Sequence, residues 1–468
     1  MNTNMNFVDK SGKNFFLRKI ELKSNYFDIL NFYEFDNNKY PFLLESSATG
    51  NERTRYSILF YEPKIKLEKK RMRDEIDFLK KLDFYVKKEK IKQDKFLLDD
   101  GTFLPFLGGW FLYLGYELVM EIEKKIKIPE SPYNLPTAIL ARVKTAVIHD
   151  KKEKNLYLIS EDSKEEIEII YKDFKKLANK KRTLKLLKNS ITIINKDSKT
   201  KHQKYVKKCI DYIFQGEIFQ ANLSRLWEFK VKKKISDELL YSRLRVTNPS
   251  PFSGIIKIGK STIISSSPER LVSLKNRKIE TRPIAGTRPR GSTGMLDVEL
   301  CRELISSEKE RAEHLMLVDL ERNDLSRVCE FGSVKVDEMM VIESYSHVHH
   351  IVSNVSGKIK KHVKPGQIIS AVFPGGTITG CPKIRCIEIL GELEKVGRGP
   401  YTGSLGYINN YGDLDINILI RTMIREGENL SLRAGGGIVA DSIPEKETQE
   451  TEAKANGMLK ALKEIYFQ

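Results

Sequence analysis

The sequence predicts a soluble α+β protein, built either as two lobes or as one large composite fold. Its 468 residues exceed the length of one ordinary domain, and 40% of them are hydrophobic, which suffices for a sizeable core. Short alternating stretches typical of strands fill most of the region from Ile20 to Ser160. From residue 201 onward, strands and helices alternate to the end of the chain.

The first region reads as strands interrupted by one helix. Residues 40–50 and 55–68 are expected to be strands joined by a polar loop, and residues 145–150 and 155–160 a β-hairpin. Apolar residues at helical spacing in the lysine- and glutamate-rich stretch 70–98 predict an amphipathic helix.

A boundary between two regions is expected near residue 190. Residues 163–182 read as a helix, and the stretch that follows, up to Thr200, is polar and rich in lysine. This divides the chain into an N-terminal region, 1–190, and a C-terminal region, 191–468.

Charge and cysteine usage narrow the class of protein. The net charge of +18 would suit a basic module that binds nucleic acid, but lysine is scattered along the chain, as coding bias also produces, so no nucleic-acid partner is expected. Five cysteines without metal-ligand spacing fit a reducing, cytoplasmic setting. No run of 18 apolar residues occurs, so no membrane span is expected.

Two pairs of glutamates are candidate metal ligands. Glu310 and Glu313 lie in one predicted helix, and Glu447 and Glu450 repeat the spacing in a terminal helix that is expected to begin near Pro444. Four carboxylates on two helices would suit a hard cation such as Mg²⁺. The alternative for each pair is a solvated helix face.

Other residues are candidates for binding anions or transferring protons. The glycine-rich segments 373–385 and 433–442 each follow a predicted strand, and bare backbone N–H groups bind carboxylates well. Arg421 lies in an apolar strand, where it needs either a carboxylate ligand or a structural ion pair. Alternation places His350 on the face opposite His347 and His349, and a histidine there is either a structural hydrogen-bonding group or a proton donor.

Ordered motifs make the chain resemble chorismate-binding enzymes of the anthranilate synthase component I type. They are SSSPERLV (265–272), TRPIAGTRPRG (281–291), ERAEHLMLVDLERNDLSRV (310–328), SYSHVHHIVSNV (344–355), FPGGTITGCPKIR (373–385), YTGSLGYI (401–408), DINILIRT (415–422) and AGGGIVADS followed by ETQET (434–451). The resemblance extends into the N-terminal region and implies two large antiparallel sheets packed face to face with outer helices.

The resemblance also implies roles for individual residues. Glu313 and Glu450 would be the Mg²⁺ ligands, with Glu310 and Glu447 beside them, and His350 would help the ring hydroxyl of chorismate to leave. The substrate carboxylates would be held by Thr377, Tyr401, Arg421, Gly435, Gly437 and Lys454.

The residue at position 220 bears on which nucleophile attacks chorismate. Water-adding members of the family carry a lysine base there, whereas this chain has Gln220, which cannot act as a general base. Ammonia is then the expected nucleophile. No cysteine lies in a G-x-C-x-G elbow, so a separate glutamine amidotransferase small subunit is the expected partner, in a heterodimer.

Two aminating activities fit the motifs. FPGGTITG, QANLSR and NPSPFSG favour the aminodeoxychorismate synthase type, which serves 4-aminobenzoate and folate biosynthesis; the alternative is the anthranilate synthase type, which serves tryptophan biosynthesis. Some enzymes of the first type attack the substrate with a lysine where this chain has Ala285, so ammonia would have to add directly, with Glu269 and Thr287 nearby. Residues 43–46 (LLES) and 248–252 (NPSPF) resemble the tryptophan pocket of anthranilate synthases, although simple strand packing would also explain them.

Overall fold

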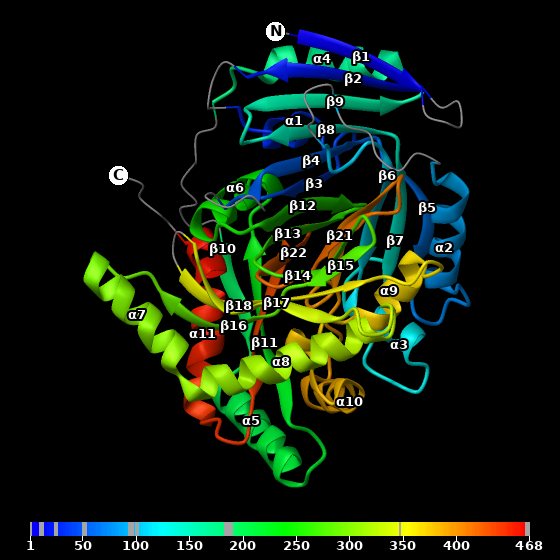
Figure 1. Ribbon diagram of the computed structural model, residues 1–468. Coiled ribbons are helices and arrows are strands. Elements are labelled where there is room, and N and C mark those ends of the chain that lie inside the picture. The colour runs from blue at the N-terminus through cyan, green and yellow to red at the C-terminus, as the bar shows by residue number, and fades with distance from the viewer. Residues whose placement is uncertain are drawn as a thin grey trace.

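The computed structural model describes residues 2–8, 14–22, 27–48, 54–91, 98, 103–181, 191–345 and 348–463. Within these residues the chain forms two large antiparallel sheets with helices around them, as Figure 1 shows. The predicted α+β sandwich is therefore confirmed. For His347, which lies outside the described residues, no position is given.

Among the described residues, 13 strands form the first sheet. Their order is β1 (Asn2–Val8), β2 (Asn14–Glu21), β9 (Asn155–Glu161), β8 (Thr145–Asp150), β4 (Tyr56–Tyr61), β3 (Phe42–Glu45), β12 (Phe252–Ile258), β13 (Ser261–Ser267), β22 (Thr422–Glu426), β23 (Asn429–Ile438), β11 (Gln220–Val231) and β10 (Ile191–Lys196), with β19 (Gly380–Cys381) paired to β11.

The second sheet has 10 strands in the same part of the chain. Their order is β16 (Ile284–Pro289), β18 (Val348–Lys358), β15 (Lys278–Thr281), β14 (Arg270–Lys275), β21 (Leu414–Asn417), β20 (Ser404–Asn409), β6 (Gly109–Leu114), β7 (Ala138–Val143) and β5 (Lys64–Lys69), with β17 (Lys335–Ser344) paired to β18.

Helices flank the two sheets. They are α1 (Leu30–Phe35), α2 (Phe78–Glu89), α3 (Val119–Ile122), α4 (Lys164–Leu177), α5 (Lys199–Phe214), α6 (Asp237–Thr247), α7 (Gly294–Ser306), α8 (Glu308–Ser326), α9 (Pro365–Val372), α10 (Lys383–Glu394) and α11 (Pro444–Leu462), with the 3-10 turns η2 (Tyr116–Leu118) and η3 (Gly376–Ile378). Of the helices in the described residues, none combines the length and the apolar character that a membrane crossing requires.

Most predicted elements appear where the sequence places them. The hairpin of β8 and β9 and the start of the terminal helix at Pro444 are confirmed. The helix expected over residues 70–98 is shorter, because Asp77 caps α2 by accepting a hydrogen bond from the Lys80 N–H. Residues 70–77 form turns instead.

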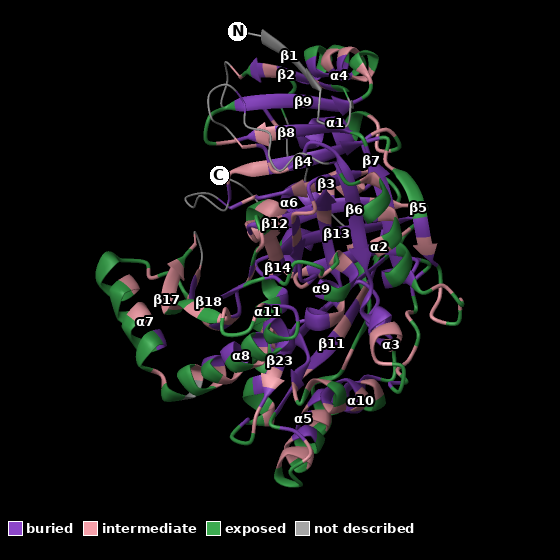
Figure 2. Cartoon of the chain, turned by 45° about the vertical axis from the view of Figure 1, so that its right-hand side comes forward, coloured by how far each residue is buried: buried purple, intermediate pink, exposed green. Residues whose placement is uncertain are grey.

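The main core lies between the sheets. Phe42 of β3, in the first sheet, stacks on Phe111 of β6, in the second, with ring centroids 4.2 Å apart. Strands β6, β7 and β9 are buried at every position, and Figure 2 shows β6 in purple near the centre of the molecule and β9 in purple near its top. Such continuous burial explains why these segments are mostly apolar in sequence. Their two charged residues, Arg142 of β7 and Glu161 of β9, form a buried ion pair.

Both sheets combine strands from the two sides of residue 190. In the first sheet, β3 pairs with β12, and in the second, β6 pairs with β20. The regions 1–190 and 191–468 thus share their hydrogen-bonded ladders.

Candidate active site

Two neighbouring strands form the floor of the site. Strand β11 pairs antiparallel with β23, and Gln220 and Asn222 project from the same face of β11 because side chains alternate along a strand. Both amides occupy space that side chains on β23 would otherwise take. A methyl group on Gly437 would lie 2.1 Å from Gln220 Nε2, and one on Gly435 would lie 2.8 Å from Asn222 Oδ1.

Helix α8 brings the first acidic pair to this floor. Ser307 caps the helix by accepting a hydrogen bond from the Glu310 N–H, so both glutamates lie in its first turns. Gln220 Nε2 donates to Glu313 Oε1 over 2.8 Å. Glu310 turns toward β16, where Arg288 Nη1 lies 3.4 Å from its Oε1.

Helix α11 brings the second pair to the same strand. A methyl group on Gly436 would lie 3.2 Å from Glu450 Oε1 and 3.7 Å from Glu447 Oε2. Lys454, one turn after Glu450, forms an ion pair with it at 2.7 Å. Ser442 donates to Glu447 Oε1 over 2.7 Å. Glu313 and the second pair, distant in sequence, therefore approach the same strand, β23.

The carboxylates are close but do not share one centre. In the described residues, no group of three or more carboxylates, histidines or cysteines is arranged to hold a metal ion. Burial raises the pKa of Glu313, and the charges of Glu310 and Glu450 raise it further against the opposing effect of Lys454. This concentration of negative charge, with oxygen donors only, fits a hard divalent cation.

A buried carboxyl group lies near this cluster. Glu269, which follows β13, is 5% exposed, and burial raises its pKa to about 8, while Thr377 opposes the shift by hydrogen bonding and the nearby Glu321 adds to it. At neutral pH the Glu269 carboxyl is therefore mostly protonated. A protonated carboxyl in a buried site can act as a general acid.

His350 and Thr287 face each other across β18 and β16. They are directly opposite in register, and Thr287 Oγ1 lies 3.0 Å from His350 Nδ1. Burial lowers the pKa of His350 to about 3, with Arg421 contributing, so the imidazole is neutral. His349 contacts Asp297 and Ser344, which confirms the predicted opposite orientation of the two histidines.

Arg421 lies between β21 and β22, and not within a strand as the sequence predicted. Its backbone is left-handed, with φ of 50°, and its Nη1 lies 3.3 Å from Asn248 Oδ1. Burial lowers the pKa of Arg421, and the nearby Glu269 partly offsets this. No carboxylate of the described residues forms an ion pair with this guanidinium, so the structural ion pair considered from the sequence is absent there.

The remaining predicted residues line the same region. Asn222 Nδ2 donates to the Thr377 carbonyl over 3.2 Å. The Tyr401 hydroxyl lies 2.8 Å from the position that a Gly435 methyl would occupy. Ala285, in β16, is buried and offers no nucleophile.

Some residues of the site are not apparent from the sequence. Arg398 donates to the backbone carbonyls of Asn222 and Ile378 and is paired with buried Glu394 at 2.7 Å. It therefore stabilises the backbone of β11 and η3 at the site. Glu321 accepts from Thr281 Oγ1 over 2.8 Å. The i,i+4 spacing of Glu394 and Arg398 was the available sequence signal for Arg398. Asn222 was missed as well, and its position two residues after Gln220 in a predicted strand was the available signal.

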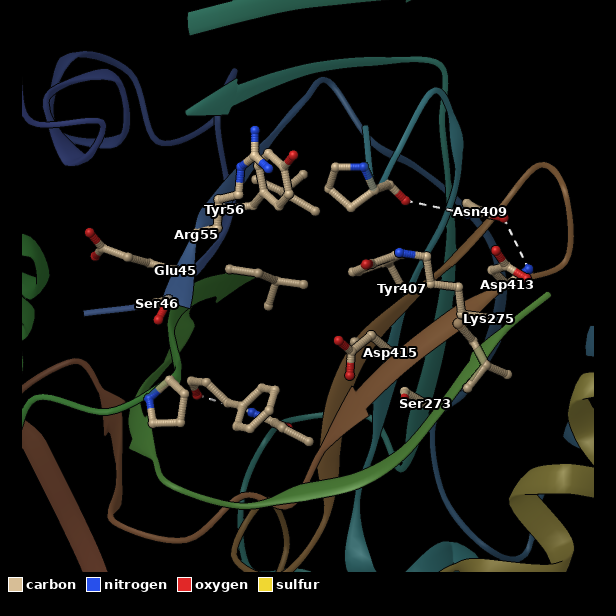
Figure 3. A pocket seen from close by; sticks show the side chains of 18 of the residues that line it. Glu45, Ser46, Arg55, Tyr56, Ser273, Lys275, Tyr407, Asn409, Asp413 and Asp415 are labelled. Carbon is tan, nitrogen blue, oxygen red and sulfur yellow. Dashed lines mark hydrogen bonds between the residues drawn. The ribbon is translucent and has the colours of Figure 1, made fainter. Parts of the chain in front are cut away.

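A pocket of about 930 Å³ lies between the sheets, and none of the four glutamates of the acidic pairs lines it. Figure 3 shows Glu45 and Ser46 on one side of it and Tyr407 and Asp415 on the other. Residues of the LLES and NPSPF segments line it together: Leu44, Glu45, Ser46, Pro251 and Phe252. Leu43 belongs instead to the hydrophobic core.

Residues 40–460 match the family model described as chorismate binding enzyme. The chain is 37% identical over 456 residues to anthranilate synthase component 1 of Acetivibrio thermocellus, with 92% of each chain covered. It is 50% identical over 257 residues to aminodeoxychorismate synthase component 1 of Bacillus subtilis (strain 168), covering 55% of this chain and 54% of that protein.

A solved structure is similar over most of the chain. Anthranilate synthase component I from Streptococcus pneumoniae TIGR4 superimposes with a TM-score of 0.75 at 31% identity, covering 88% of this chain and 93% of that one. The relatives therefore share a family and a fold while carrying different names for their reactions.

Proposed function

Because the chain belongs to the chorismate-binding enzyme family, we propose that it is the large component of an aminodeoxychorismate synthase. The enzyme would convert chorismate and ammonia into 4-amino-4-deoxychorismate and water, with Mg²⁺ as cofactor, in the cytoplasm. The observation that carries this proposal is the buried carboxyl of Glu269, whose pKa burial raises to about 8, in a site whose strand position 220 is a glutamine.

Glu269 is suited to release the ring hydroxyl. The departing oxygen needs a proton to leave as water, and the raised pKa of Glu269 keeps that proton available at neutral pH. Neutral His350, with Thr287 3.0 Å from its Nδ1, would orient the hydroxyl by hydrogen bonding rather than as a charged acid.

The substrate's two carboxylates would be bound by groups with few or no anionic partners. Arg421 and Tyr401 would bind one carboxylate, with Thr377 and the backbone of Gly435 and Gly437 nearby. Lys454, now paired with Glu450, would turn toward the substrate once a cation takes its place beside that carboxylate.

Glu313 and Glu450 would hold Mg²⁺, with Glu310 and Glu447 beside them. The bound ion would supply Lewis-acid and templating chemistry for a substrate carboxylate. Gln220, which donates to Glu313 over 2.8 Å, would orient that ligand.

A separate glutamine amidotransferase subunit would supply the ammonia. Glutamine hydrolysis by such enzymes needs a reactive thiolate, whereas burial raises the pKa of Cys209 to about 12 and of Cys329 to about 11. Burial likewise raises the pKa of Cys301, Cys381 and Cys386. These thiols are poor nucleophiles, which supports a heterodimer.

Anthranilate is the second candidate product. Ala285 in place of a lysine nucleophile favours it, and so do the full-length relatives with the name anthranilate synthase component 1. Both candidates add ammonia to chorismate and release the ring hydroxyl as water. The anthranilate route adds nitrogen at ring position two and then expels pyruvate, whereas the aminodeoxychorismate route replaces the hydroxyl at position four and keeps the pyruvyl ether.

One reaction distinguishes them. The purified protein is incubated with chorismate, Mg²⁺ and an ammonium salt, and the product is separated by chromatography. We expect ammonium-dependent loss of chorismate and a product that added 4-amino-4-deoxychorismate lyase converts to 4-aminobenzoate. If fluorescent anthranilate forms instead, the protein is an anthranilate synthase component and the first candidate is wrong. Glu313→Ala and Glu450→Ala should each abolish turnover without unfolding; turnover at the wild-type rate would rule out the metal assignment.

A further inference from the structure

An apolar patch is exposed on the outside of the molecule, next to a strand that forms the floor of the site. It consists of Phe214, at the end of α5, Phe219, in the loop before β11, and Ile384, in the first turn of α10. Their exposed fractions are 75%, 67% and 46%. Single exposed apolar residues are common, but a cluster with two aromatic rings usually marks a contact with another molecule.

Two contacts hold the parts of this apolar patch together. The Phe219 N–H donates to the carbonyl of Cys381, three residues before Ile384, over 2.7 Å. Arg385, which follows Ile384, forms an ion pair with Glu217 at 2.6 Å. The two phenylalanines lie at the two ends of the short turn that contains Glu217. Figures 1 and 2 both show α5 and α10 next to each other at one end of the molecule.

The core beneath the apolar patch is built from other side chains. Cys209 of α5 and Ile218 of the turn are buried in one hydrophobic cluster with Cys386 of α10. The exposed rings of Phe214 and Phe219 are not part of that cluster. They are therefore available for a contact outside this chain.

The apolar patch adjoins the site through the backbone. Phe219 directly precedes Gln220, whose Nε2 donates to Glu313 Oε1 over 2.8 Å. A molecule bound at the patch would thus lie within one residue of the floor of the site. The other exposed phenylalanines among the described residues belong to other parts of the chain: Phe35, Phe84 and Phe331.

We propose that Phe214, Phe219 and Ile384 dock the glutamine amidotransferase subunit that supplies ammonia. This rests on the proposed function and adds the surface on which the subunit binds. Ammonia released into water at neutral pH takes up a proton, and ammonium has no lone pair with which to attack chorismate. The subunit must therefore release ammonia next to the site. The apolar patch offers aromatic anchors of the kind that stabilise protein interfaces at that place.

Charge around the apolar patch favours a different chain over a second copy of this one. Lys204, Lys207 and Lys208 are exposed on α5, the helix that ends at Phe214. A two-fold contact through the patch would bring the lysines of both copies together, and each copy carries a net charge of +18. An amidotransferase subunit with an apolar centre and an acidic margin on its docking face would be attracted instead.

Two nitrogen sources separate docking from catalysis. Chorismate consumption by the full-length protein is measured with ammonium chloride alone, and with glutamine plus the purified amidotransferase subunit of the same organism. Phe214→Ser and Phe219→Ser each remove one exposed ring, and isothermal titration calorimetry gives the Kd for the subunit. We expect each change to raise this Kd about 30-fold, the effect of losing one interface hot spot of about 2 kcal/mol. Glutamine-dependent turnover should fall at limiting subunit, whereas ammonium-dependent turnover should stay unchanged.

A matched control removes an exposed ring elsewhere. Phe84 is 63% exposed on α2, which lies away from α5 and α10 in both Figure 1 and Figure 2. Phe84→Ser should alter neither the Kd nor either turnover. Thermal unfolding checks that each variant folds, and Ile384→Ser gives a third, independent change in the apolar patch.

Each outcome decides the proposal. An unchanged Kd with unchanged glutamine-dependent turnover would show that the subunit binds elsewhere. Parallel loss of ammonium- and glutamine-dependent turnover would show that the apolar patch supports the site itself. A wild type that sediments as a dimer, with monomeric serine variants, would assign the patch to a second copy. Ammonium-dependent turnover by the wild type keeps the proposed function in all three cases, and its absence overturns both proposals.

Discussion

At the scale of single residues, Glu269 shows how burial changes the pKa of an ionisable side chain. Its surroundings offer Thr377 and the Ile284 N–H as hydrogen-bond donors and Lys454 as a cation, yet burial and Glu321 prevail and its pKa rises to about 8. The unfolded chain would have the ordinary value near 4.5. The folded protein thus holds a proton that the unfolded chain loses across this interval.

This difference makes stability depend on pH in a defined direction. Because the folded pKa is raised, the contribution of Glu269 is fully present below about pH 4.5 and is lost as pH rises to about 8. Glu269→Gln removes the ionisable group and therefore this loss of stability at high pH. We expect the variant to melt at a higher temperature than the wild type at pH 9, with the difference shrinking toward pH 5, as measured by calorimetry.

The same variant should lose activity. Removing a general acid typically costs about 100-fold to 10,000-fold in rate. A Glu269→Gln protein that is no more stable than the wild type at pH 9 would contradict the raised pKa, whatever its activity. Glu428→Gln, at an exposed position in the turn between β22 and β23, is a suitable control for the loss of one carboxylate.

At the scale of elements, the glycines of β23 make room for side chains of β11. A methyl group at Gly437 would overlap Gln220 Nε2 at 2.1 Å. Since that atom ends a flexible side chain, the strand can keep its register while Gln220 rotates away. Its hydrogen bond to Glu313 would then be lost.

Gly437→Ala should therefore impair the site more than the fold. We expect turnover of chorismate to fall by roughly 100-fold, because small displacements of positioned groups have large effects on rate. The melting temperature should change little. Gly294→Ala is the matched control, since its methyl would meet nothing within 4 Å. Equal activity of both variants would argue against a role for Gln220.

At the scale of the whole molecule, the two sequence regions complete each other's sheets. Strand β12 needs β3 on one side, and β20 needs β6. A protein cut between the regions would expose long unpaired strand edges, which promote aggregation.

Residues 191–468 expressed alone should therefore be insoluble or lack cooperative unfolding. Co-expression of residues 1–190 as a separate chain should restore a soluble complex, because it supplies the missing strands. Circular dichroism and size-exclusion chromatography provide the measurements. A soluble fragment with a single sharp thermal transition would show that the C-terminal region folds by itself.

Much of the local structure follows from the sequence. Pro444 marks the start of α11, and the apolar spacing around Glu313 predicts α8. The predicted length of the helix over residues 70–98 was wrong. Its apolar spacing continues on both sides of α2, but the Asp77 side chain caps the helix, which therefore begins at Phe78. The site residues assigned by resemblance stay predictions, although the fold brings Glu313, Glu450 and Tyr401 to strand β23.

The sequence by itself determined the family, the mixture of helices and strands, and the two acidic pairs, because these depend on order, spacing and periodicity along the chain. Only the tertiary structure decided that Glu313 and Glu450 approach the same strand, that Glu269 is buried enough to keep its proton, and that the oxygens of Gln220 and Asn222 lack donors among the described residues. These properties depend on burial and on partners far along the chain, such as Glu313, which is 93 residues from Gln220. No local pattern encodes the electrostatic surroundings that such distant partners create.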